Sequence, residues 1–182
     1  MRQRRPKPQA AGEDSPASRL TPEEIRARAF QRAVKLLAAK PRSIAELRER
    51  LAERCSSQTV IETVIARLRE YGYLDDERYA LGYASSKVRQ QPIGRRRLEL
   101  SLQRKKVDRA VADEALDQVY AETPEEGLLD RALEKRIRLR GRPKTRAEAK
   151  SLFDHLLRQG FPFELVSQKV RAASKADLDD AE

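Results

Sequence analysis

The feature that most constrains this chain is an internal repeat of about fifty residues. Three prolines, Pro41, Pro92 and Pro143, are spaced 51 residues apart each time. The tetrapeptide Thr-Pro-Glu-Glu occurs at residues 21–24 and again at 123–126, twice that spacing. Apolar positions follow the same period, namely Leu47 and Leu51, then Leu98 and Leu102, then, after a three-residue shift, Leu152 and Leu156. Chance similarity among helices rich in Ala, Leu and Arg would not place all of these features at one period, so we expect three copies of one unit.

The pattern within each unit predicts three short helices. Apolar residues three or four positions apart share a helix face, as in the stripe of Val60, Val64 and Leu68. Capping boxes are expected where Thr21, Ser43 and Thr145 are each followed three residues later by Glu, and Gly72 is a natural helix end. The predicted helices span 22–39, 44–54 and 58–70, then 76–90, 93–105 and 109–121, then 124–140, 146–159 and 163–173.

The expected fold is therefore all-α: a tandem array of three three-helix modules, elongated and curved. The modules are predicted at 21–73, 74–122 and 123–174, with a disordered basic tail at 1–20 and an acidic frayed end at 175–182. Tryptophan is absent and aromatic residues make up 5%, so one deep core is hard to fill. Small units stack on their neighbours instead, which gives a long binding surface and no enclosed pocket.

Charge is the strongest sequence-level indication of a partner. The net charge is +10, and two blocks, 85–106 and 135–150, each carry eight basic residues and one acid. Between them, residues 108–130 hold eight acids and one Arg. Any single charge is typically a solvated surface group, but the two blocks together favour an anionic partner. The candidate contact residues are Lys87, Arg89, Arg95, Arg96, Arg97, Arg104, Lys105, Lys106, Arg136, Arg138, Arg140, Arg142 and Lys144.

Three segments resemble a known family, the RecX regulators of the RecA recombinase. Residues 42–51 (RSIAELRERL) are similar to its RS-x-x-EL-x-x-(K/R)-L stretch, and residues 72–80 (GYLDDERYA) resemble its G-(Y/F)-(L/I)-(N/D)-D-x-x-(F/Y)-A junction. A third segment begins at Gly94 and departs from the family pattern at Lys106, where that pattern has Gly. The matching positions, which we expect to be structural, are Ser43, Glu46, Leu47, Leu51, Gly72, Leu74, Asp75, Asp76, Tyr79, Gly94, Leu98 and Leu102.

The resemblance implies a modulator that binds the RecA filament on single-stranded DNA. Such a protein would block filament extension or promote disassembly, lowering ATPase, strand-exchange and coprotease activity. The single cysteine and the lack of an apolar run long enough for a secretory signal or a membrane span predict a cytoplasmic protein, and we expect a monomer with no membrane contact. The residues alone lead only to a basic helical-repeat protein, so the alternative is a stand-alone nucleic-acid binder without RecA specificity.

Catalytic or metal chemistry is not expected, and no cofactor is implied. Asp75, Asp76 and Glu77 lie at a predicted helix start, where acids cap backbone N–H groups more often than they hold a metal. Cys55 and His155, the only residues of their types, fall in different modules. No Gly-rich phosphate loop occurs. Four tyrosines around the first junction could stack on unpaired bases, although filling the interface between modules is the favoured interpretation.

Overall fold

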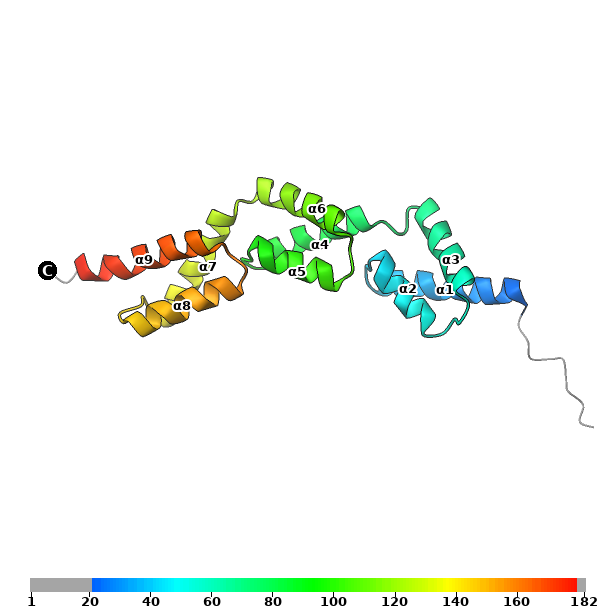
Figure 1. Ribbon diagram of the computed structural model, residues 1–182, viewed down its shortest axis with the longest axis horizontal. Coiled ribbons are helices and arrows are strands. Elements are labelled where there is room, and N and C mark those ends of the chain that lie inside the picture. The colour runs from blue at the N-terminus through cyan, green and yellow to red at the C-terminus, as the bar shows by residue number, and fades with distance from the viewer. Residues whose placement is uncertain (1–20, 180–182) are drawn as a thin grey trace, which may run out of the picture.

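The computed structural model describes residues 21–179 of the chain. In that range it contains nine helices and no strand, so the predicted all-α fold is confirmed (Figure 1). The helices are α1 (Pro22–Ala39), α2 (Ile44–Ala52), α3 (Gln58–Glu70), α4 (Asp76–Gln90), α5 (Arg95–Arg104), α6 (Arg109–Glu122), α7 (Glu125–Arg140), α8 (Arg146–Arg158) and α9 (Phe163–Asp179).

Successive triplets of helices pack on each other and follow one another along an arched, elongated molecule (Figure 1). Helices α1–α3 form the first module, α4–α6 the second and α7–α9 the third. The expected tail at 1–20 lies outside the described residues.

The apolar core is divided into two parts, not three. One cluster, which includes Ala33, Leu47 and Leu68, lies wholly within the first module. The other is continuous from Ala80 in α4 to Val170 in α9 and so joins the second and third modules. The second and third modules therefore share one core, whereas the first module has its own.

Several helix ends differ from the expected positions. Helix α5 begins at Arg95 and not at residue 93, because Ile93 is buried before the turn and Gly94 is the N-cap. Helix α2 ends at Ala52, two residues early. Helix α9 continues to Asp179 beyond the expected end at residue 173, since the added segment contains the good helix formers Ala, Lys and Leu; residues 180–182 are not described.

Two of the three expected capping boxes form. The capping boxes at Thr21 and Thr145 are present with their reciprocal Glu partners. Ser43 caps α2, but the carboxylate of Glu46 binds Lys105 instead of returning to the cap. The second Thr-Pro-Glu-Glu makes no capping box, because Pro124 is the N-cap of α7 and the carboxylate of Glu126, three residues after Thr123, binds Lys169 at 2.9 Å instead.

Candidate nucleic-acid interface

The second helices of the three modules, α8, α5 and α2, meet head to tail at both junctions. At the first junction the hydroxyl of Ser43, N-cap of α2, donates to the carbonyl of Lys105, C-cap of α5, at 2.5 Å. At the second, the N–H of Gly94, N-cap of α5, donates to the carbonyl of Gln159, C-cap of α8, at 3.0 Å. Ser43 and Gly94 are 51 residues apart and Lys105 and Gln159 are 54 apart, so one contact is built twice by the repeat.

Close backbone approach explains the glycines at the second junction. A Cβ on Gly94 would lie 2.2 Å from the carbonyl carbon of Gly160, far inside van der Waals contact. Gly160 has φ +92° and would place a Cβ 2.5 Å from the backbone nitrogen of Arg97. Both positions therefore exclude a side chain, and they fix how the third module sits against the second.

Polar contacts hold the first junction. The amine of Lys105 binds Glu46 at 2.7 Å, with side-chain exposures of 23% and 19%. Burial on its own raises the pKa of Glu46, but the hydrogen bond and charge of Lys105 outweigh it and lower that pKa. Asp76 accepts from the N–H of Ile44 at 2.9 Å, and burial raises its pKa. Asp75 caps its own helix α4 as predicted, whereas Asp76 accepts from the first N–H of α2 in the neighbouring module.

Lys106 shows why the family pattern has glycine at its position. It is the one non-glycine residue with positive φ, +56°, in the described part of the chain. Its N–H bonds the carbonyl of Gln103 and the N–H of Val107 bonds that of Leu102, which is the Schellman helix end that favours glycine. The repeat offset of 54 places Gly160 at the equivalent position. The amine of Lys106 pairs with Glu49 in the first module.

Four of the thirteen candidate basic residues make side-chain hydrogen bonds or ion pairs within the protein. Lys105 and Lys106 bind across the first junction, and Arg97 donates to the side chain of Gln159 at 2.6 Å across the second. Arg95 binds Asp117 at 2.6 Å, and its N–H binds Glu125, so carboxylates of this chain meet the N-terminus of α5. Among the described side chains, those of residues 21–174, no ion pair involves Lys87, Arg89, Arg96, Arg104, Arg136, Arg138, Arg140, Arg142 or Lys144.

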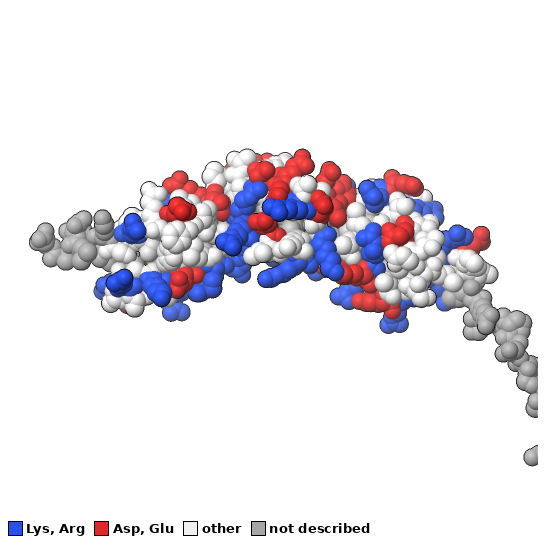
Figure 2. Space-filling view, in the orientation of Figure 1, with Lys and Arg blue, Asp and Glu red and all other residues white. Residues whose placement is uncertain are grey.

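The two basic blocks converge near His155 in α8. Burial, and then the charges of Arg136, Arg158, Arg140 and Arg97, lower the pKa of this imidazole. Arg97 comes from the first block and Arg136 and Arg140 from the second. Arg136, Arg140 and Arg142 also line a shallow groove of about 270 Å³. Figure 2 shows blue atoms gathered along the lower edge beneath α5 and α8, and red atoms along the upper edge over α6.

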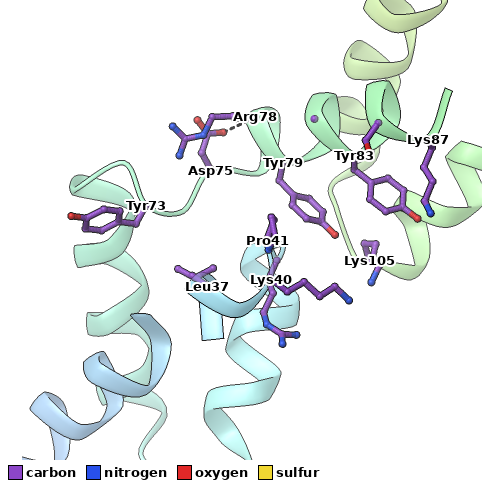
Figure 3. Close-up of a pocket in the computed structure, with 13 residues that line it drawn as sticks. Leu37, Lys40, Pro41, Tyr73, Asp75, Arg78, Tyr79, Tyr83, Lys87 and Lys105 are labelled. Carbon is purple, nitrogen blue, oxygen red and sulfur yellow. Dashed lines mark hydrogen bonds between the residues drawn. The ribbon is translucent and has the colours of Figure 1, made fainter. Parts of the chain in front are cut away.

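A second groove, of about 770 Å³, lies at the first junction (Figure 3). Tyr79 and Tyr83 of α4 line it, and both are half-buried. Tyr71 and Tyr73 are instead 52% and 64% exposed, so only part of the tyrosine cluster packs between modules. The basic residues that line this groove are Lys40, Arg42, Arg78, Lys87 and Lys105. Lys40, Arg42 and Arg78 lie outside the two blocks that the charge count singled out.

The described residues hold no group of three His, Cys, Asp or Glu side chains that could bind a metal ion. Cys55 follows α2 in the first module and His155 lies in α8 of the third, and these two modules are at opposite ends of the arch (Figure 1). No described helix has both the length and the apolar character needed to cross a bilayer.

The fold and the distribution of charge define a class: a helical-repeat binding protein with basic grooves and a head-to-tail series of helices. Comparison with known proteins identifies the family. Its profile for the first RecX three-helix domain matches residues 29–68, and its profile for the second matches residues 75–116. The chain belongs to the RecX family of regulatory proteins.

Relatives and solved structures agree with this assignment. Regulatory protein RecX of Thermobifida fusca is 30% identical over 170 residues, covering 92% of this chain and 91% of the relative. That of Treponema pallidum is 38% identical over 109 residues, 60% of this chain and 66% of the relative. The crystal structure of RecX from Lactobacillus salivarius has a TM-score of 0.73 at 18% identity, covering 85% of this chain and 99% of that one, and so shows the same fold.

Proposed function

We propose that this protein is a negative modulator of RecA that binds the RecA filament on single-stranded DNA. It blocks filament extension or promotes disassembly, and so lowers ATPase, strand-exchange and coprotease activity. It acts as a monomer in the cytoplasm, through binding alone, with no cofactor and no catalysis of its own.

The convergence of the two basic blocks supports this proposal most directly. The charges of Arg97 from one block and of Arg136 and Arg140 from the other all act on His155 and help to lower its pKa, although about forty residues separate the two blocks in sequence. The stacked modules carry this basic region along an extended surface instead of enclosing it in a pocket (Figure 2). An extended, positively charged surface suits a long polyanion or nucleoprotein. The specific partner, RecA, is inferred from membership of the family.

The alternative is a nucleic-acid-binding protein that acts without RecA. Its binding to bare DNA would be tight and would weaken steeply with salt, because phosphate contacts release counterions. A filament-specific protein should instead prefer RecA-coated DNA to bare DNA at the same salt concentration.

The test is a titration of the ATPase activity of RecA on single-stranded DNA with the full chain. We expect inhibition at well below one regulator per RecA, because each bound regulator affects growth or integrity of a whole filament. Binding to the same DNA without RecA is measured in parallel. Inhibition only at amounts that coat the DNA would favour simple competition and contradict the proposal.

A further inference from the structure

The tyrosine pair in the groove at the first junction is not explained by packing alone. The rings of Tyr79 and Tyr83 stack with centroids 6.1 Å apart and an angle of 26° between planes. Their apolar edges pack on the core of the second and third modules, yet both line the groove. Figure 3 shows their hydroxyl groups pointing the same way, and that of Tyr79 donates to the carboxylate of Glu46 at 3.4 Å. The pair thus borders an open space instead of being closed inside the core.

Cations surround this pair. The amine of Lys87 lies 5.7 Å from the centroid of the Tyr83 ring, within cation–π range. Five basic residues line the groove against one acid, Asp75, whose carboxylate already caps α4. Lys105 is held by Glu46, whereas no ion pair in the described part of the chain involves Lys40 or Lys87. Positive charge in the groove therefore exceeds what the protein's own acids balance.

We propose that this groove binds an unpaired nucleotide of single-stranded DNA, with a base against the tyrosine pair and a phosphate held by Lys40 and Lys87. Aromatic side chains in a positively charged groove are the combination by which proteins hold unpaired bases without sequence preference. Its volume, about 770 Å³, lies in the range of pockets that take nucleotide-sized ligands. An acidic peptide would use the lysines but would leave the aromatic faces without a partner, so the observations favour a nucleotide.

This inference deepens the proposed function, since it names one site for single-stranded DNA. The biological role of the site rests on the proposed function, whereas nucleotide binding in the groove does not. The site lies between modules, because Lys40 and Arg42 belong to the first module and the tyrosines to the second. Binding there would also couple the position of the first module to the presence of unpaired DNA.

The experiment uses the full chain and a fluorescent oligothymidylate, with affinity measured by anisotropy. Tyr83→Leu removes the ring and is expected to weaken binding about tenfold, whereas Tyr83→Phe keeps the stacking surface and should bind as the wild type does. Lys87→Gln should reduce the slope of log affinity against log salt by about one, and the matched control Lys35→Gln, an exposed lysine of α1, should leave the slope unchanged.

A second readout does not depend on the variants folding well. Photo-crosslinking of wild-type protein to an oligonucleotide with 5-iodouracil should modify Tyr83 or Tyr79, as mapped by mass spectrometry. The inference would be overturned by crosslinks confined to other residues, or by equal binding of the Tyr83→Leu and Tyr83→Phe variants. It would also be overturned if a polyglutamate peptide displaced the DNA and itself crosslinked in the groove. In those cases wild-type inhibition of RecA would still stand. Absence of that inhibition, with the crosslink present, would refute the proposed function alone.

Discussion

Gly94→Ala tests how the third module is fixed to the second. The new Cβ would lie 2.2 Å and 2.3 Å from the carbonyl carbon and oxygen of Gly160, both backbone atoms that cannot rotate away. Relief requires a shift of more than about 1 Å, because carbon atoms pack at about 3.5–4.0 Å. That shift strains the shared core, at about 1–3 kcal/mol, and breaks the bond from the Gly94 N–H to Gln159, at about 1 kcal/mol or more. We therefore expect a loss of about 3 kcal/mol in the free energy of unfolding.

The assay is thermal unfolding followed by circular dichroism. For a chain of this length, a loss of about 3 kcal/mol lowers the Tm by roughly 6–12 °C. Gly127→Ala is the matched control, since a Cβ there meets nothing within 4 Å and the residue lies within α7. Replacing a helical glycine by alanine without a clash stabilises by up to about 1 kcal/mol. A Gly94→Ala protein that melts as high as the Gly127→Ala protein would refute the close-contact account of this junction.

Two further predictions concern the first junction and the arginine cluster. Glu46→Gln should lower the free energy of unfolding by about 1–2 kcal/mol, because it leaves the mostly buried amine of Lys105 without its anion. Glu49→Gln breaks an exposed ion pair and should cost less than about 0.5 kcal/mol. Equal unfolding midpoints of the two variants in urea would contradict this. His155, the only histidine, should titrate below its ordinary pKa of 6.5 by NMR, so stability falls as the pH drops below 6.5. Arg136→Gln should raise that pKa and Arg138→Gln should not, and a wild-type pKa at or above 6.5 would count against the cluster.

The architecture could be predicted from the sequence because it depends on local and periodic signals. The helical spacing of apolar residues and the N-cap residues are local signals, because they depend on residues only a few positions apart. The 51-residue period is visible because the same residue types recur at it. The periodic leucines, such as Leu47 and Leu98, are fully buried in the structure. The misplaced start of α5 reflects one residue, Gly94, whose role depends on a neighbour in another module.

The roles of individual charges could not be predicted in the same way. Lys105 and Lys106 look like free cations in sequence, but their partners Glu46 and Glu49 lie almost sixty residues away. Only the packing of two modules brings these groups together. The groove at the first junction was missed for the same reason, because Lys40 and Arg42 adjoin Pro41 in one module and the tyrosines belong to the next. Two signals of a packed junction are present in the sequence: the tyrosines that cluster between the first two modules, and Lys106 in the glycine position of the family pattern.

The most direct test of the basic surface compares two double variants of α7 in the RecA ATPase titration. R136Q/R140Q removes two charges from the cluster near His155, whereas R131Q/K135Q removes two from exposed positions on another face of the same helix, neither of them a candidate contact residue. We predict that the first variant needs several-fold more protein for half-inhibition while the second matches the wild type. Equal loss in both variants, or no loss in either, would show that the arginine cluster does not carry the interaction.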